Sequence, residues 1–367
     1  MPNLVAKENW QALTVDDVQE MQPSILDQHH ATVALREPGW GLITWRIGVW
    51  ATAAKIEAGV AGPRLTALEE DTIQADHPQL LCTADGYVMI GNTPAGLAGA
   101  AFDQDGAVVQ NPSLVLSTEN AMWPDLAVRG DDLPVAIWAR PGQIQGARLG
   151  PEFETVEVLP AIQGLALTLT PSIAAGATGF VAAWAEDFGD TAVVTVQRLD
   201  PLGIPVGPSL EVDSVASYDG APRPYVATRH DGGFAVTWRR GEDTTEAAAW
   251  VRIYDGDDRA VVELSLHETG PAMKPALASD GETLVVAWEG YGADGHHIRM
   301  RLYDFEDLLP LTEVATLSVD ADRRHERPYV AVVPDGDGLY GVVSWETQTS
   351  VDDGSQKAVR IRAFSWR

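Results

Sequence analysis

Two sets of side chains that could do chemistry recur along the chain at fixed places in a repeated pattern. The first set mostly stands directly before a proline, and consists of His30, His77, Trp123, Thr170, Arg223, Lys274 and Arg327. The second set closely follows a recurring Trp, and consists of Arg46, Asn92, Arg140, Glu186, Arg239 with Arg240, Glu289 and Glu346. Arg and Lys bind anionic groups, an indole offers a stacking surface, and imidazole can accept a proton near neutral pH.

Antiparallel strands must position these side chains. Each repeat contains an X-Pro step, a short apolar strand, a turn rich in Asp and Gly, a second strand that ends on a Trp, and a third alternating strand. A fourth strand follows in all repeats but the last. The second strands end at Trp45, Gly91, Trp138, Trp184, Trp238, Trp288 and Trp345. Four short strands in a period of about 45–50 residues are typical of a β-propeller blade.

The chain is therefore predicted to be one all-β domain over residues 1–367. We expect a single seven-bladed β-propeller with four antiparallel strands per blade. The blades are predicted to start near residues 31, 77, 123, 170, 223, 274 and 327. The last repeat lacks a fourth strand, while residues 3–14 read as one isolated strand. Because an unpaired sheet edge is unfavourable, we expect this N-terminal strand to pair in blade seven and close the ring.

In such a meander the first strand begins at the end of the ring where the second strand finishes, so both sets of side chains share one face. The predicted ligand-binding residues at this tunnel mouth are His30, Arg46, His77, Trp123, Arg140, Arg223, Arg239, Lys274, Tyr291 and Arg327. The alternative is that these cations pair with acidic residues of neighbouring blades and only hold the blades together. The repeated Trp residues are expected to fill the core between blades.

Composition excludes several partners. The formal net charge of −28 disfavours binding to nucleic acids and to anionic membrane surfaces. Cys82 is the single cysteine, so no intrachain disulfide is possible. No apolar run is long enough to span a bilayer. The N-terminus does not resemble a signal peptide, so we expect a cytoplasmic protein unless a leader was removed, and an extracellular or cell-surface one if it was.

Neither a metal site nor a cofactor is expected. The histidines come from several repeats without a short ligand spacing. The Asp-rich turns at 103–106, 255–258 and 335–338 are compatible with Ca²⁺, but none completes an EF-hand pattern, so solvated turns are expected. No nucleophile, paired acids or phosphate loop forms a recognisable catalytic set.

One repeat carries a family resemblance. The stretch Phe180-Val-Ala-Ala-Trp184, followed by Gln197-Arg-Leu-Asp200 and Gly203-Ile-Pro-Val-Gly207, resembles the signature of bacterial seven-bladed β-propeller repeat proteins of the secreted or surface type. The resemblance implies the fold and a binding or adhesive role, and it implies no catalytic residues.

The first functional expectation is a non-catalytic binding or interaction module. It would present the tunnel mouth to an anionic or polar small ligand, a glycan or a protein partner. The second expectation is a hydrolase or lyase at the same face, with His30 or His77 as base and an Arg that stabilises an anion. The third is a structural subunit of a larger assembly.

Overall fold

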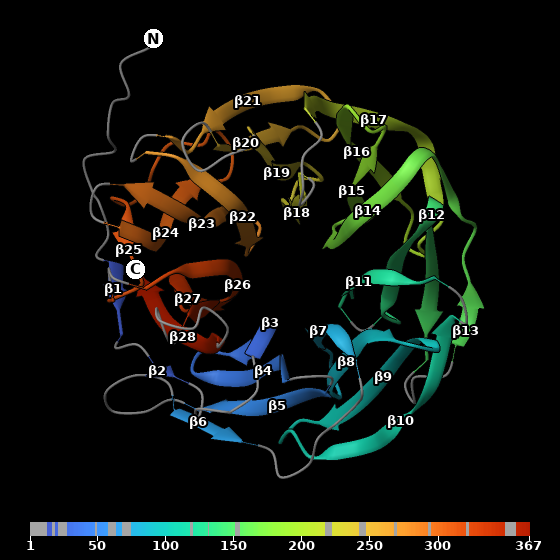
Figure 1. Cartoon of the computed structure of the whole chain (residues 1–367), viewed down its shortest axis with the longest axis horizontal. Helices are drawn as coiled ribbons and strands as arrows, with labels where there is room; N and C mark the ends of the chain where they lie inside the picture. The colour runs from blue at the N-terminus through green and yellow to red at the C-terminus, as the bar shows by residue number, and fades with distance from the viewer. Residues whose placement is uncertain are drawn as a thin grey trace.

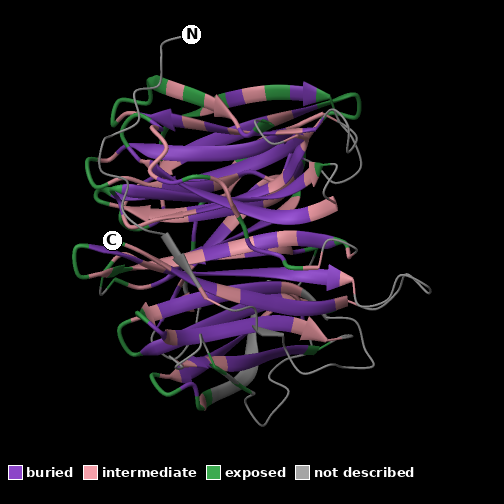
Figure 2. Ribbon diagram, turned by 90° about the vertical axis from the view of Figure 1, so that its left-hand side faces the viewer, coloured by how far each residue is buried: buried purple, intermediate pink, exposed green. Residues whose placement is uncertain are grey.

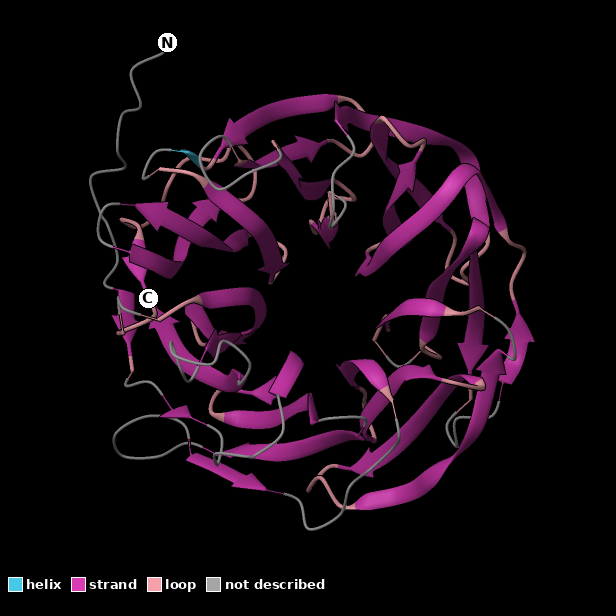
Figure 3. Ribbon diagram, in the orientation of Figure 1, coloured by secondary structure: helices cyan, strands magenta, loops and turns pink. Residues whose placement is uncertain are grey.

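The structure is a computed structural model of the chain. It describes residues 13–16, 19–20, 28–47, 50–57, 64–67, 75–117, 120–130, 132–150, 155–216, 222–241, 247–267, 270–292, 295–320, 323–348 and 357–367. The described residues form strands and turns with no α-helix, and Figure 3 shows only one short helical turn in cyan among them. Among them, no helix is long and apolar enough to cross a membrane.

Four of the six sheets have four strands that pair in chain order. The first contains β3 (Gln28–Glu37), β4 (Trp40–Ile47), β5 (Trp50–Glu57) and β6 (Arg64–Ala67). The second contains β7 (Asp76–Cys82), β8 (Gly86–Thr93), β9 (Gly96–Asp103) and β10 (Val108–Ser117). The other two contain β18 (Tyr225–Thr228), β19 (Phe234–Arg240), β20 (Ala248–Tyr254) and β21 (Ala260–Ser265), and β22 (Ala272–Ser279), β23 (Thr283–Gly292), β24 (Gly295–Asp304) and β25 (Ala315–Thr316).

A larger sheet takes in two of the predicted repeats. It contains β11 (Met122–Ala127), β12 (Val135–Leu149), β13 (Thr155–Val158), β14 (Ile162–Gly176), β15 (Gly179–Asp187), β16 (Thr191–Leu199) and β17 (Pro205–Ala216). The first part of β14 pairs with β12, and the rest of β14 pairs with β15. The expectation of a separate sheet for each repeat is therefore wrong here, because the long strand β14 hydrogen-bonds to both neighbours.

The last sheet joins the two ends of the chain. It contains β26 (His325–Asp335), β27 (Gly338–Gln348) and β28 (Lys357–Trp366), and both β1 (Leu13–Val15) and β2 (Gln19–Glu20) pair with β28. The predicted strand at residues 3–14 lies largely outside the described residues, and its described part belongs to β1. Side-chain contacts also link this sheet to the first one, because Trp45 packs against Val359 and Ile361.

The sheets are arranged around a common centre in a propeller-like ring (Figure 1). The first strand of each set, β3, β7, β11, β14, β18, β22 and β26, lies nearest to that centre. Buried residues run along the strands, and exposed residues gather at the turns and outer edges (Figure 2). This arrangement places the ends of the inner strands, and hence the first set of predicted side chains, around one opening.

The recurring Trp residues form the core between neighbouring sheets, as predicted. Trp288 packs against Ala249 and Val251 of the preceding sheet, and all six Trp residues at this position are buried. Gly91 stands where the other repeats carry Trp. A Cβ atom there would lie 2.8 Å from the Cβ of Ala75, so the close approach of residue 75 explains why this repeat has no side chain at the position.

Candidate functional site

The seven residues of the first predicted set share an unusual backbone conformation. Their φ angles are 52° at His30, 48° at His77, 50° at Trp123, 44° at Thr170, 45° at Arg223, 40° at Lys274 and 52° at Arg327. Left-handed φ is uncommon for residues other than glycine and costs free energy, most of all for a β-branched residue such as Thr. We call these seven residues the mouth ring. The same costly conformation at one position in every repeat indicates a functional constraint on that position.

An irregularity in the inner strands accompanies this conformation. In β3 the pairing register with β4 shifts between His29 and Thr32, and comparable shifts flank the ring position in β7, β11, β14, β22 and β26. A bulge releases a residue from the regular alternation of a strand and can re-aim its side chain. The inner strands therefore turn the ring residues away from their sheets.

The mouth ring lines a single cavity. All seven members contribute to its wall, together with Ala31, Thr32, Gln79, Pro124, Asp125, Pro171, Pro224, Tyr225, Pro328 and Tyr329. Among the predicted ligand-binding residues, the structure brings His30, His77, Trp123, Arg223, Lys274 and Arg327 to this cavity. The residues of the second set lie close behind the ring, as their pairing with the inner strands shows: His29 pairs with Arg46 and Glu326 with Glu346.

Four predicted residues do not line the cavity. Arg46 forms an ion pair instead of lining the cavity, since its guanidinium lies 2.9 Å from the Asp76 carboxylate. Arg239 is buried and donates a hydrogen bond to the carbonyl of residue 241. Tyr291 stacks on His296, with ring centroids 4.1 Å apart. Arg140 lies outside the cavity wall. The structure therefore does not bring these four residues to the cavity, although they lie in β4, β12, β19 and β23, which continue from the inner hairpins.

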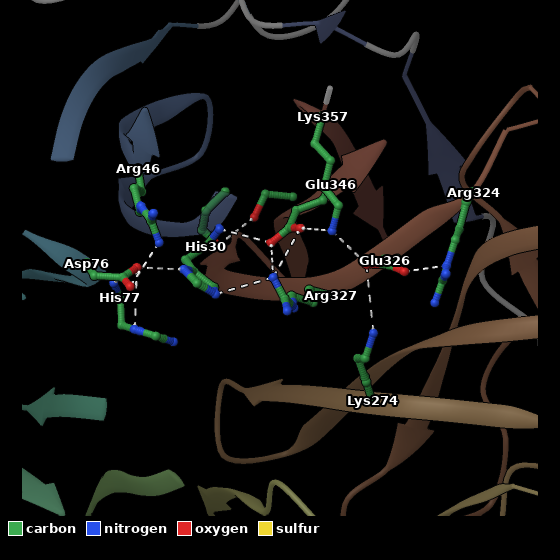
Figure 4. Close-up of polar contacts among 12 residues, drawn as sticks. His30, Arg46, Asp76, His77, Lys274, Arg324, Glu326, Arg327, Glu346 and Lys357 are labelled. Carbon is green, nitrogen blue, oxygen red and sulfur yellow. Dashed lines mark hydrogen bonds and ion pairs between the residues drawn. The ribbon is translucent and has the colours of Figure 1, made fainter. Parts of the chain in front are cut away.

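His30 is held by two hydrogen bonds (Figure 4). Its Nδ1 lies 3.1 Å from Asp76 Oδ1, and its Nε2 lies 3.3 Å from Arg327 NH1. A guanidinium can only donate, so Nε2 accepts, and Nδ1 carries the proton that is donated to Asp76. Burial lowers the pKa of His30. His30 is therefore a neutral imidazole of defined tautomer, with both nitrogens engaged.

His77 lies beside His30 but has different polar contacts. The two imidazole rings stack with centroids 4.0 Å apart. His77 Nδ1 lies 3.4 Å from Asp76 Oδ1, but it is buried without a hydrogen-bond partner in the described part of the chain. Burial and the neighbouring His30 lower the pKa of His77 to about 3. His77 is thus a neutral imidazole at pH 7 that can still accept a proton.

Asp76 organises this pair. Burial alone would raise the pKa of its carboxyl group, but the hydrogen bond from His30 and the two imidazoles bring the pKa well below the usual range. Its Oδ1 also accepts the backbone N–H of His77. His30, Asp76 and His77 could together offer three ligand atoms to a metal ion, all within 4.8 Å of one another. The hydrogen bond from His30 and the ion pair with Arg46 already use this carboxylate, so the arrangement suits an acid–base site.

The cations of the ring differ in their partners. Lys274 Nζ lies 2.9 Å from Glu289 Oε1, and Arg327 NH1 lies 3.1 Å from Glu346 Oε1. The Glu289 carboxylate is fully buried, and that of Glu346 is nearly so. For these two residues, and for Arg46, pairing with acidic residues is what the structure shows. Arg223 is different, because none of the described residues forms a hydrogen bond or ion pair with its guanidinium. Burial and the charge of Arg327 lower its pKa.

Three further polar residues of the wall escaped the sequence prediction. Asp125, Tyr225 and Tyr329 each stand two positions after a ring residue. Burial raises the pKa values of both tyrosines, and no described residue bonds to either hydroxyl group. Burial also raises the pKa of Asp125 to about 6. The signal available in the sequence was their constant position two residues after the ring residue of the same repeat.

Comparison with known proteins identifies no family. No protein-family model and no curated protein matches the sequence. Among solved structures, the chain is similar to the endo-arabinase of Bacteroides thetaiotaomicron VPI-5482, with 13% sequence identity, 77% of this chain and 92% of that chain covered, and a TM-score of 0.41. A likeness of this degree carries no argument about a reaction, so no residue role is transferred from it.

The first functional expectation is not retained. It was a non-catalytic binding module, whereas the similar structure named above is that of an endo-arabinase. The prediction failed because repeats of this kind specify a fold, and a fold hosts many functions. The function proposed below therefore rests on the chemistry of the cavity residues.

Proposed function

We propose that the cavity is the active site of an enzyme that cleaves an anionic, polar substrate such as an acidic glycan. One observation carries this proposal: a neutral imidazole, an unpaired guanidinium and an indole line the same cavity, as His77, Arg223 and Trp123. Ionisable groups with strongly shifted pKa values in one pocket are typical of catalytic sites.

The residues divide into base, anion site and support. His77 is assigned as the general base on its geometry, because its imidazole lines the cavity and only its backbone N–H has a hydrogen-bond partner among the described residues. Arg223 binds the anionic group of the substrate. Asp76 and His30 fix the position of His77, one through a backbone hydrogen bond and the other through ring stacking. Trp123 supplies a stacking surface, and its ring meets the His77 ring edge-on at 6.4 Å.

The cavity wall does not support the two-carboxylate mechanism of most glycoside hydrolases. Asp125 is the one carboxylate among its described lining residues. Its Oδ1 accepts the N–H of Leu126, and its Oδ2 accepts the N–H of Ile173. The bond from Ile173 ties β11 to β14, and no second carboxylate stands among the described residues of the wall. Imidazole base catalysis is therefore the chemistry that this wall supports.

We also infer the arrangement that creates the opening. The pairing of β1 and β2 with β28, and the packing of Trp45 on β28, support a single domain of seven repeats closed by its N-terminal segment. In that arrangement the two repeats that share the larger sheet count as separate blades. Closure would fix the mouth ring as a complete circle around the cavity.

Three variants of the full chain test the proposed activity. Wild type is incubated with polygalacturonate, alginate and hyaluronate, and new chain ends are measured over time. His77→Asn and Arg223→Gln should each lower the rate by at least about a hundredfold, while the matched control Arg140→Gln, outside the cavity, keeps it. Cleavage that survives both cavity substitutions would place the active site elsewhere. Absence of cleavage of all three polymers by wild type would count against an acidic-glycan substrate.

A further inference from the structure

Among the described residues, the charged groups around the mouth ring leave one positive charge without an ion pair. Lys274 is paired with Glu289, and Arg327 is paired with Glu346. The same carboxylates also accept backbone N–H groups of the ring, since Glu289 Oε1 accepts from Arg327 and Glu346 Oε1 accepts from His30. These acids are thus built into the scaffold. Arg223 alone among the ring cations has no anionic partner in the described chain.

From this balance, and resting on the proposed function, we propose that the substrate carries a single carboxylate on a sugar ring and is cleaved by β-elimination. A guanidinium presents two parallel N–H donors that match the two oxygens of a carboxylate. One spare positive charge matches one negative charge. A phosphate monoester is close to a dianion at pH 7, so one of its charges would stay unpaired in a partly buried cavity.

The wall also fits a sugar ring next to that carboxylate. Trp123 and His77 are consecutive members of the mouth ring, and their rings meet edge-on. A pyranose that stacks one apolar face on the indole therefore presents its ring C–H groups beside the imidazole. Arg223 stands on the other side of Trp123, separated from it in the ring by Thr170. The carboxylate and the carbon that bears it can thus be addressed by Arg223 and His77 together.

The elimination step balances without an added reactant. His77 takes the proton from the carbon that bears the carboxylate. The electron pair of that C–H bond forms a C=C double bond to the neighbouring carbon, whose C–O bond to the leaving sugar breaks. The leaving oxygen takes a proton from the Tyr225 hydroxyl at the cavity wall, and solvent returns the proton from His77 to Tyr225. Arg223 stabilises the charge that develops on the carboxylate during proton removal.

A binding experiment tests the substrate class independently of turnover. Calorimetric titrations compare glucuronate, glucose and glucose 6-phosphate on wild type and on the full-length variants Arg223→Gln and Arg140→Gln. We expect glucuronate to bind wild type at least about tenfold more tightly than either other sugar. Arg223→Gln should remove that preference, and Arg140→Gln should keep it. Preference for glucose 6-phosphate, or a glucuronate preference that survives Arg223→Gln, would overturn the carboxylate assignment.

Product analysis tests the reaction and separates the two proposals. Elimination forms a C=C bond conjugated to the carboxylate, so ultraviolet absorbance rises in step with new chain ends. New chain ends without that absorbance would overturn the elimination and leave an acid–base hydrolase at the same site. Conversely, glucuronate binding through Arg223 without cleavage of any polymer would support the carboxylate site and refute the proposed catalysis. Tyr225→Phe should slow the elimination without weakening glucuronate binding, while the matched control Tyr340→Phe, outside the cavity wall, should leave the rate unchanged.

Discussion

Replacement of Arg223 by Met should make the protein more stable while it removes the proposed binding of a carboxylate. The guanidinium lines the cavity and has no ion pair with the described residues. Its pKa is lowered by burial and by Arg327, which shows that the folded protein holds this charge at a cost. Met has similar length and no charge, so the variant keeps the packing and loses the cost.

The size of the effect follows from what surrounds the side chain. Replacement of buried ion pairs by well-packed apolar residues is often neutral or stabilises proteins by about 1–4 kcal/mol, because the charges no longer have to be desolvated. Arg223 is only partly buried, so water still screens part of the charge and the lower half of that range applies. We expect Arg223→Met to raise the free energy of unfolding by about 2 kcal/mol.

Urea unfolding monitored by tryptophan fluorescence measures this difference, in a buffer free of carboxylates. Addition of glucuronate should stabilise wild type in proportion to the logarithm of its concentration and should leave Arg223→Met unchanged. The matched control is Arg327→Met. Its partner Glu346 is only 1% exposed and would keep only Lys357, at 3.1 Å, as a cation partner. We therefore expect Arg327→Met to lower the free energy of unfolding by about 3 kcal/mol.

The two arginines of one ring should therefore respond with opposite signs. If Arg223→Met destabilises the protein as Arg327→Met does, the Arg223 guanidinium contributes to folding. The inference that it is reserved for a ligand would then be wrong.

Other predictions concern acid stability and glycine geometry. The pKa of His77, about 3 in the folded protein, lies below its ordinary 6.5, so the unfolded chain binds more protons in between and stability should fall as pH drops below 6.5. Burial would raise the pKa of Glu289, but a hydrogen-bonded histidine and a lysine bring it to about 2, so the stability that this carboxylate contributes should be lost as pH falls from about 4.5 towards 2. Urea unfolding midpoints measured across both pH ranges check these two predictions. His77→Gln should reduce the loss of stability below pH 6.5. Gly179→Ala should cost about 3 kcal/mol, because the new Cβ would lie 2.1 Å from the carbonyl oxygen of Leu199. Gly256→Ala is the control, with its nearest contact at 3.5 Å; equal unfolding midpoints for the two variants would contradict this reasoning.

The positions of the mouth ring could be predicted from the sequence, but its backbone conformation could not. Trp and X-Pro mark the two ends of the inner hairpin, so the repeat pattern alone assigns His77, Trp123 and Arg223 to one face. A residue that precedes proline is normally extended. Nothing in the identity of Trp123 or Thr170 indicates a left-handed φ, because that conformation accompanies the register shifts of β11 and β14 at these positions.

Which cations are paired was equally beyond the sequence. Lys274, Arg223 and Arg327 occupy equivalent positions in consecutive repeats, yet only Arg223 lacks a partner among the residues that the structure describes. The difference lies in the residue that directly follows the recurring Trp, which is Glu289 or Glu346 beside the paired cations. An acidic chain offers many candidates for such pairs, so the choice among them is made by the three-dimensional packing of neighbouring sheets.

His, Trp, Thr, Arg and Lys all occupy the same left-handed position of the mouth ring. Lys274 and Arg327 are tied to the scaffold through the buried acids Glu289 and Glu346, whereas Trp123, Thr170 and Arg223 form no ion pair with the described residues. Exchange of these three residues would therefore alter recognition while the sheets keep their pairing. The ring is a natural starting point for directed evolution towards new substrates.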